Sequence, residues 1–171
     1  MVPDMLSKTE AEQMISKSSK YQHMMLVSRI MKYLAKRFHA DENEWEITGM
    51  LHDLDYDITG DDSDQHGVLA ASMLDDRVPE EVKQAIRAHH PLTGYRPATL
   101  LDKALVFADC SAWLIADQGL LDAHADLKMA LTKEGAQKPI VVRNVQEFAS
   151  ASNLSIEDMI SNLVPIGHHA R

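Results

Sequence analysis

Apolar and polar residues alternate with a helical period along almost the whole chain, so the sequence predicts an all-α fold. Capping signals agree with this period, because a short polar residue stands three residues before an acidic one at several expected helix starts. These starts are Ser7-x-x-Glu10, Asp41-x-x-Glu44, Thr99-x-x-Asp102 and Ser155-x-x-Asp158. Ser63 or Asp64 is the expected start of a further helix, and Pro79 stands in the first turn of another.

The period and the caps together place the helices along the chain. They are expected at residues 11–19, 21–39, 41–51, 65–76, 80–90, 100–117, 123–133, 141–153 and 156–164. Residues 55–64 and 90–98 have the least helical character and are expected to be loops. The sequence "PIVV", residues 139–142, could form a short strand, although it does not alternate.

Composition and charge narrow the possible functions. The 171 residues are 45% hydrophobic and 25% charged, as in a globular domain with a core. The net charge of -9 argues against binding to a nucleic-acid backbone, which needs clustered Lys and Arg. No apolar run reaches the roughly 20 residues of a membrane span, and the first ten residues lack the features of a signal peptide, so we expect a cytoplasmic protein. The single Cys110 excludes an internal disulfide and a cysteine-based zinc site.

Four polar residues lie on the apolar faces of separate predicted helices. Each shares its face with apolar side chains: His23 with Val27, Ile30 and Leu34; His66 with Leu69, Ala70 and Met73; His89 with Val82, Ala85 and Ile86; Asp109 with Leu105, Val106, Ala112, Trp113 and Ala116. A single inward histidine is usually a hydrogen-bonded core residue. A buried aspartate is harder to explain, because an unpaired carboxylate in an apolar medium needs a cation or several hydrogen bonds.

The stretch "ITGMLHDLDYD", residues 47–57, places His52 and Asp53 after an apolar turn, and Asp55 and Asp57 follow. On its own, a helix end with a solvated acidic loop explains this pattern. Together with the inward histidines and aspartate, it predicts a shared metal site, because imidazole and carboxylate groups are ligands of transition metals. The ligand types suit Fe, Mn, Zn, Co or Ni.

The order His23, then His52-Asp53, then Asp109 resembles the H…HD…D signature of the HD-domain superfamily of metal-dependent phosphohydrolases. The resemblance covers about residues 21–120 and implies a compact HD-like helical bundle. We expect residues 1–171 to form a single domain, in which about residues 121–171 add C-terminal helices. Those helices could cap the site, pair two chains or complete the core, and the sequence does not indicate an oligomeric state.

The resemblance also implies a set of metal ligands. The ligands of the first metal would be His23, His52, Asp53 and Asp109. Asp53 would bridge to a second divalent metal, whose further ligands would be His66 and His89, giving two metals per chain. His90 is a further candidate, although its helical direction turns it away from His89.

The chain departs from a common family form after its His-Asp pair, where "LDYD" stands in place of a small residue followed by Lys. Asp55 or Asp57 could supply a proton to the leaving group instead, or both could be solvated loop acids; the catalytic candidates are Asp53 and Asp57. Three basic residues near the motifs could hold a phosphate: Arg87, Arg96 and Lys103. The other histidines are expected to be exposed and without a role: His39, His124, His168 and His169.

The activity implied by the resemblance is hydrolysis of a phosphomonoester or phosphodiester, of a nucleotide or similar small molecule, by metal-activated water. Within this class, an alternative is a mononuclear enzyme acting on nucleoside 5′-monophosphates. Outside it, the alternatives are a non-catalytic module that binds a nucleotide or partner protein, and a di-iron oxygenase. Cys110 has no evident base on its helical face, so thiol catalysis is not expected.

Overall fold

The computed structural model describes residues 5–118 and 139–167 of the chain. Within these ranges it consists of helices joined by turns and loops and contains no strand, so the all-α prediction is confirmed. The possible strand at residues 139–142 is wrong, because Pro139 begins a helix. None of the helices in this part of the chain is both long and apolar enough to cross a lipid bilayer. The helix predicted at residues 123–133 lies outside the described residues.

The helices follow the order that the sequence predicts. They are α1 (Lys8–Ile15), α2 (Tyr21–Phe38), α3 (Glu42–Leu51), α4 (Tyr56–Thr59), α5 (Val68–Leu74), α6 (Glu80–Ala88), the 3-10 helix η1 (Pro91–Thr93), α7 (Leu100–Gln118), α9 (Pro139–Ala151) and α10 (Ile156–Gly167). The short helices α4 and η1 lie inside the two segments that were expected to be loops. The division of the chain into one motif-bearing core and a C-terminal extension stays a prediction.

Side-chain caps begin several helices at the predicted positions. The capping box is complete at α1, where Ser7 Oγ accepts a hydrogen bond from Glu10 N and Glu10 Oε2 accepts one from Ser7 N. The predicted caps of α3, α7 and α10 are Asp41, Thr99 and Ser155. Each side chain accepts a hydrogen bond from the backbone N–H of the residue three positions further along the chain. These local bonds explain why the sequence alone located these starts.

Helix α5 begins later than predicted, so the expected start at residue 63 or 64 is wrong. Residues 61–67 form turns, and Gly67 precedes the helix with a φ of 87°. A Cβ atom on Gly67 would lie 2.6 Å from the carbonyl oxygen of Ile86, so the close packing of this turn on α6 requires glycine. His66 therefore lies in a turn and shares no helical face with the residues after it, yet it is buried by this packing.

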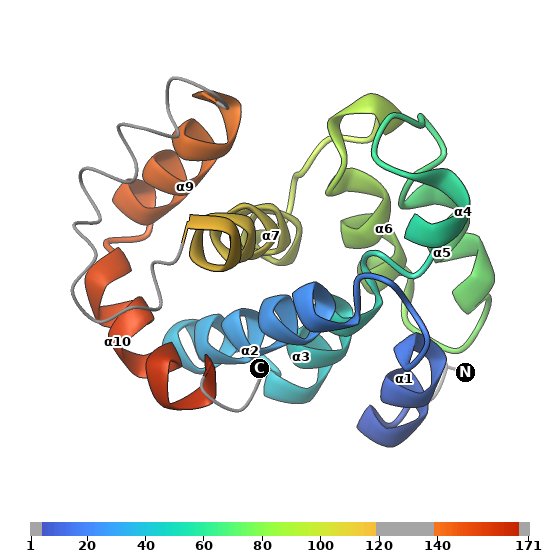
Figure 1. Ribbon diagram of the computed structural model, residues 1–171, viewed down its shortest axis with the longest axis horizontal. Helices are drawn as coiled ribbons and strands as arrows, with labels where there is room; N and C mark the ends of the chain where they lie inside the picture. Colours follow the sequence, from blue (N-terminus) through green and yellow to red (C-terminus); the bar gives the residue numbers. More distant parts are fainter. Residues whose placement is uncertain (1–4, 119–138, 168–171) are drawn as a thin grey trace.

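Helix α7 lies at the centre of the fold, with α9 and α10 on one side and α4, α5 and α6 on the other (Figure 1). It packs against α2, α3, α6 and α9. Helices α2 and α3 lie against each other so closely that a Cβ on Gly49 would be 2.7 Å from Ser28 Cα. The ends of α3 and α6 and the first turn of α2 are thereby directed toward the middle of α7.

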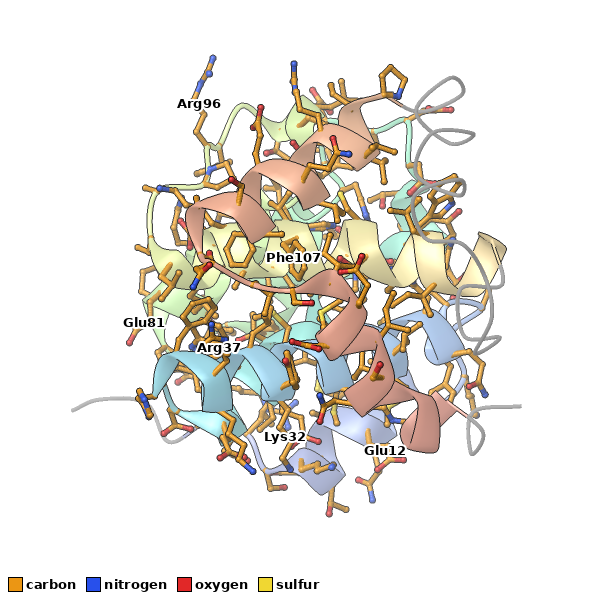
Figure 2. The ribbon with its side chains drawn as sticks, turned by 90° about the vertical axis from the view of Figure 1, so that its left-hand side faces the viewer. Glu12, Lys32, Arg37, Glu81, Arg96 and Phe107 are labelled. Carbon is orange, nitrogen blue, oxygen red and sulfur yellow. The ribbon has the colours of Figure 1, made fainter. Side chains whose placement is uncertain are left out.

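The core joins the C-terminal helix α9 to the rest of the bundle. Phe107 on α7 is fully buried, and its ring stacks on that of Phe148 at 4.7 Å, while Phe148 meets Phe38 of α2 edge to face. Figure 2 shows Phe107 inside the fold, whereas Arg37 of α2 lies at the surface, where its Nη2 donates a hydrogen bond to Asn153 O at 3.0 Å. The burial of these rings holds α9 beside α7, where it lines a cleft described below.

Candidate metal centre

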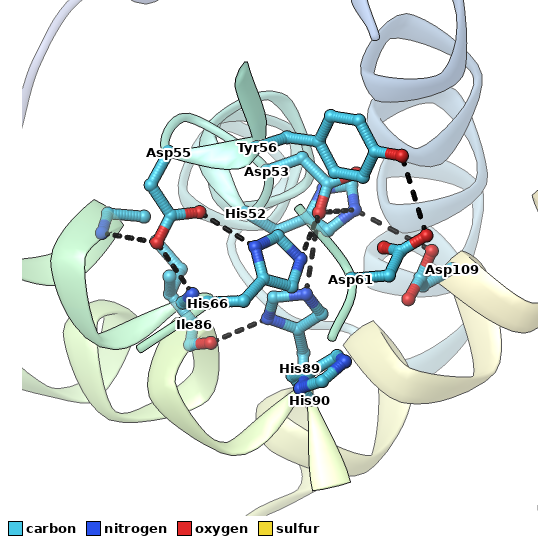
Figure 3. A network of polar contacts seen from close by, with 12 residues as sticks. His52, Asp53, Asp55, Tyr56, Asp61, His66, Ile86, His89, His90 and Asp109 are labelled. Atoms are coloured by element: carbon cyan, nitrogen blue, oxygen red, sulfur yellow. Dashed lines mark hydrogen bonds and ion pairs between the residues drawn. The ribbon is translucent and has the colours of Figure 1, made fainter. Parts of the chain in front are cut away.

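Five helices or helix ends bring the predicted ligands together at one place. His23 comes from the first turn of α2, His52 and Asp53 follow α3, and Asp109 lies in the middle of α7. His66 and His89 enter from the turn before α5 and from the end of α6. Figure 3 shows the imidazole rings converging on the Asp53 carboxylate. All six residues that were predicted as ligands are therefore neighbours in space.

The carboxylate of Asp53 lies at the centre of this cluster. Its Oδ1 is 3.0 Å from Nε2 of His66 and 3.4 Å from Nε2 of both His52 and His89. Its Oδ2 is 3.6 Å from Nε2 of His23. The two oxygens thus face different histidines, which is the arrangement a carboxylate needs to bridge two metal ions.

Asp109 completes the side of the cluster formed by α2. Its Oδ1 lies 2.9 Å from Nε2 of His23 and 3.6 Å from Nε2 of His52. The atoms of two overlapping groups lie within 4.8 Å of one another, as metal ligands do: His23, His52 and Asp109 in one, and His52, Asp53 and His89 in the other. The Asp109 side chain is 29% exposed, so this side of the cluster is open to a cleft.

The backbone sets which nitrogen of two histidines faces the cluster. Nδ1 of His52 donates a hydrogen bond to the carbonyl oxygen of Gly49 at 2.8 Å, and Nδ1 of His89 donates one to Ile86 O at 2.6 Å. Because a carbonyl oxygen only accepts, Nδ1 of each ring carries a proton, and Nε2 offers a lone pair to the cluster when the ring is neutral. Burial lowers the pKa of His52, but the charge of Asp53 and the contacts with Asp109 outweigh it and raise the pKa well above its ordinary value in the absence of a metal. Such outer contacts are typical of metal-binding histidines.

The residues fit a bound metal ion. Among the described residues, Nε2 of His52 is buried and has no hydrogen-bond partner, although it points at two carboxylates. A buried polar atom without a partner costs stability, so it calls for a ligand. A divalent cation held by this nitrogen and the carboxylates would satisfy it, and the donor set of imidazoles and carboxylates suits transition metals.

The two carboxylates of the cluster stay ionised. Burial raises the pKa of Asp53, but the charge and hydrogen bonding of the neighbouring histidines, His52 above all, hold that pKa well below its ordinary value. Desolvation likewise raises the pKa of Asp109, and the contacts with His23 and His52 outweigh it and lower the pKa far more. Ionised carboxylates are the form that binds cations.

His66 contacts two carboxylates at once. Its Nδ1 donates to Asp55 at 2.9 Å, and its Nε2 lies 3.0 Å from Asp53. Burial lowers the pKa of His66, but the hydrogen bonds to Asp53 and Asp55 outweigh it and raise the pKa to about 9. Without a metal, His66 therefore carries a positive charge, and it would have to give up the proton on Nε2 to bind a metal ion there.

Asp55 has a role that the sequence reasoning missed. It is fully buried, and its Oδ2 accepts hydrogen bonds from Gly67 N at 2.7 Å and from Ala70 N at 3.0 Å, while its Oδ1 accepts one from His66. Burial raises its pKa, but these donors lower it below the ordinary value. Asp55 is thus neither a solvated loop acid nor a proton donor, because it is an ionised acceptor that orients His66. Its two-residue spacing from Asp53 was the only sequence signal.

The structure does not bring Asp57 to the cluster. Its carboxylate accepts hydrogen bonds from the backbone N, at 3.0 Å, and the hydroxyl of Ser19, and these bonds lower its pKa. The side chain is exposed and joins α4 to the segment before α2. The geometry therefore gives no support to Asp57 as a proton donor. His39 is exposed, as expected; the expectations for His124, His168 and His169 concern residues outside the described ranges.

His90 turns toward the cluster, contrary to the direction expected from a continuous helix. Helix α6 ends at Ala88, and His90 has an extended backbone, so helical periodicity does not apply to it. Its ring centre is 5.0 Å from that of His66. Its Nδ1 is also buried without a hydrogen-bond partner among the described residues, so His90 stands beside the six central residues as a further possible ligand.

A cleft of about 540 Å³ opens beside the cluster, between the end of α6, residues 91–97, α7 and α9. Asp109, His89 and His90 form its inner wall, and Arg96 and Arg143 contribute positive charge. Figure 2 shows Arg96 extending outward from the edge of the fold. Arg143 was missed by the sequence analysis, because nothing in its local context on α9 distinguishes it from a surface residue.

The other two predicted phosphate-binding residues are placed differently. Arg87 is paired with Glu80, with Nη1 2.6 Å from Oε1, and its guanidinium lies over the ring of Tyr95. Lys103 lines a neighbouring hollow rather than the cleft at the cluster. Cys110 lines the cleft, and burial raises the pKa of its thiol to about 12, so the thiol is protonated near neutral pH.

Comparison with known proteins agrees with this arrangement. A family model described as HD domain matches residues 21–114, which is more than half of the chain. The matched range contains every predicted ligand, from His23 to Asp109, whereas α9 and α10 lie beyond it. No curated protein sequence and no solved structure showed significant similarity to the chain.

Proposed function

Because the chain belongs to the HD-domain family, which is a superfamily of metal-dependent phosphohydrolases, we propose that it hydrolyses a phosphoester of a small molecule with the help of two divalent metal ions. The observation that carries the proposal is the position of Asp53. One of its oxygens faces His23, and the other faces His66 and His89. A carboxylate placed between two groups of histidines is suited to bridging two ions.

The residues of the cluster divide into two ligand sets. His23, His52, Asp53 and Asp109 would hold one metal, and Asp53, His66 and His89 the other, with His90 as an additional candidate. HD domains bind divalent metals, and the bound ions supply Lewis acidity toward a phosphoryl oxygen and activate a water molecule as nucleophile. Iron, manganese, zinc, cobalt or nickel would suit these ligands.

The residues of the cleft would bind and orient the substrate. Arg96 and Arg143 line the cleft and would turn toward a bound phosphate, Arg96 from solvent and Arg143 from its contact with Glu147. Arg is suited to this because its guanidinium makes two parallel hydrogen bonds. The net charge of -9 makes this local positive charge important for attracting an anion. The partial exposure of Asp109 leaves a path from the cleft to the metal ligands. The leaving group could take its proton from solvent, because neither Asp55 nor Asp57 is suited to donate one.

The proposal is tested by metal content and turnover measured together. Protein purified without chelator is analysed for metals, beside Asp53→Ala and the matched control Asp76→Ala, whose carboxylate is exposed. We expect about two metals per chain in the native protein and in the control, and loss of metal in Asp53→Ala. The native protein and the control should hydrolyse members of a panel of nucleotides and other phosphoesters, and Asp53→Ala should not. Asp53→Ala with native phosphatase activity would contradict the proposal.

The same experiment separates the alternatives. About one metal per chain, with turnover, would remove His66 and His89 from the ligand set and favour the mononuclear reading with nucleoside 5′-monophosphates. Ligand-induced stabilisation without turnover would indicate a non-catalytic binding module. Oxygen consumption with a polyol or phosphonate would indicate a di-iron oxygenase.

A further inference from the structure

The cleft at the metal cluster continues into a second hollow of about 380 Å³. The two share Pro97, Val106 and Asn144 among their lining residues, so a single molecule can extend from one into the other. The second hollow lies farther along the groove between α7 and α9, where Lys103 and Phe148 contribute to its wall.

Two helices run in opposite directions along this groove. On α7 the lining residues lead from Asp109 through Val106 to Lys103, and on α9 they lead from Asn144 to Ala151. At about 1.5 Å per residue, the paths are about 9 Å long on α7 and about 10.5 Å long on α9. This length suits a molecule with a phosphate at the metal cluster and one or two rings beyond it.

The chemistry of the wall changes along the groove. At the cluster end, Arg96 and Arg143 offer positive charge to an anion. In the middle, the contact of the Asn144 amide within the described part of the chain is a long one of 3.9 Å to Cys110 Sγ, which is a weak acceptor, so the amide can hydrogen-bond a ligand instead.

Beyond Asn144 the wall is mainly apolar and carries balanced charge. Val106 and the ring of Phe148 line this part of the groove, and the buried ring of Phe107 lies behind them. Lys103 and Glu147 stand at its edge, and Glu147 Oε1 also lies 3.8 Å from Arg143 Nε. Lys103 is thus the one cation among the described residues that line this end, and an acid stands beside it, so the end offers little attraction for a second phosphate. An uncharged group that buries apolar surface is therefore favoured there.

We infer that the hollow between α7 and α9 binds the organic part of the substrate, and that this part is a flat, uncharged aromatic or heteroaromatic group. The inference rests on the proposed phosphoester site at the cluster end of the cleft. Helix α9 lies outside the residues matched by the family model, so a helix of this chain's own C-terminal part would select among phosphoesters.

A series of three non-hydrolysable phosphonates measures the preference of the hollow for aromatic groups. Methylphosphonate, phenylphosphonate and biphenyl-4-ylphosphonate share the phosphonate group and differ only in how far they reach along the groove. Calorimetric titration of the metal-containing protein should give tighter binding at each step, with at least about a tenfold gain from the first probe to the last, because each ring buries apolar surface. Equal affinity for all three would overturn the inference.

A pair of variants at the end of α9 locates the binding site. Ala151→Trp should fill the far end of the hollow and reduce the affinity for the biphenyl probe to that for phenylphosphonate, without changing the affinity for phenylphosphonate. The control Ser150→Trp makes a similar change at an adjacent exposed residue that does not line the hollow, and it should leave all three affinities unchanged. An Ala151→Trp protein with the native affinity order would overturn the inference. Both residues are exposed, so both variants should fold, and circular dichroism checks this.

The outcomes separate this inference from the proposed function. Graded binding without turnover of any phosphoester would support the aromatic subsite and contradict the phosphohydrolase. Turnover of phosphoesters with no preference for aromatic ones, and no gradation among the phosphonates, would do the reverse. Tighter binding of a probe with a carboxylate on its outer ring than of the biphenyl probe would overturn the uncharged character assigned to the group.

Discussion

Replacing Asp55 with asparagine tests how the cluster orients its histidines. In the native protein, the carboxylate accepts from His66 Nδ1 with one oxygen and from Gly67 N and Ala70 N with the other. Asparagine has the same shape but only one oxygen. If that oxygen keeps the two backbone donors, its amide NH₂ faces Nδ1 of His66, which must then accept a hydrogen bond. The proton of the neutral ring would move to Nε2, the nitrogen that a metal needs.

The size of the effect follows from these contacts. One hydrogen bond to a buried charge is lost and two are weakened, and each such bond contributes about 1.5–3 kcal/mol, while removal of a buried charge offsets part of the loss. We therefore expect Asp55→Asn to lower the free energy of unfolding by about 2 kcal/mol. For a chain of this size, that change lowers the melting temperature by roughly 4–8 °C. Loss of an outer partner of a ligating histidine typically lowers metal affinity 10–100-fold.

Elemental analysis and calorimetric metal titration, beside thermal unfolding, measure both effects. The result expected for Asp55→Asn is a folded protein that keeps the metal held by His23 and Asp109 and binds the second metal weakly. Asp76→Asn, at an exposed carboxylate, is the matched control and should resemble the native protein. Two metals bound with native affinity in Asp55→Asn would refute the orienting role, even if the melting temperature fell.

Four further expectations test the cluster and its support, two through pH and two through substitution. Metal uptake should release a proton, because the pKa of His66 is raised to about 9 and its Nε2 must be deprotonated to bind a metal. The affinity for the metal should then fall by up to about tenfold for each pH unit below 9. Calorimetry of metal binding in two buffers counts the protons released. In the metal-free protein, the same raised pKa contributes stability that is complete below about pH 6.5 and is lost as the pH rises through about 9. Gly49→Ala should cost at least about 2 kcal/mol in denaturant unfolding, because its Cβ would lie 2.7 Å from Ser28 Cα and force α2 from α3. Phe107→Ala should cost about 3–5 kcal/mol by the same assay, since it opens a cavity beside Phe148.

Each of these expectations has a contrary outcome. Metal binding without proton release would show that His66 is neutral before binding or is not a ligand. Native stability in Gly49→Ala would mean that α2 and α3 can separate slightly without loss. A cost below about 1 kcal/mol for Phe107→Ala would mean that α9 is not held to α7 by the stacked rings, and the groove between them would lose its rigid wall.

The sequence by itself determined the features that depend on near neighbours. Helix caps form between residues three positions apart, so they could be located without knowing the fold. They are at Ser7, Asp41, Thr99 and Ser155. Helical period likewise showed that His23 and Asp109 point inward, because residues within one continuous helix keep a constant angle to one another. The family resemblance then related these separate positions to one cluster, and the structure brings them together.

Only the tertiary structure decided the directions and contacts of the side chains that lie beyond the helix ends. His66 and His90 both lie where no helix continues, so their directions follow from packing and not from period. Asp55 and Asp57 are two residues apart but lie in different environments. Asp55 is buried against the turn before α5, whereas Asp57 is exposed and hydrogen-bonded to Ser19.

The cleft shows the same limit over a longer distance. Arg143 and Asn144 reach it because stacked rings hold α9 against α7, more than thirty residues away along the chain. Local hydrogen bonds and helical angles can be calculated from a short stretch of sequence. The direction of a side chain in a turn, and the partner of a helix face, depend instead on which distant surfaces exclude water together, and only the folded chain specifies them.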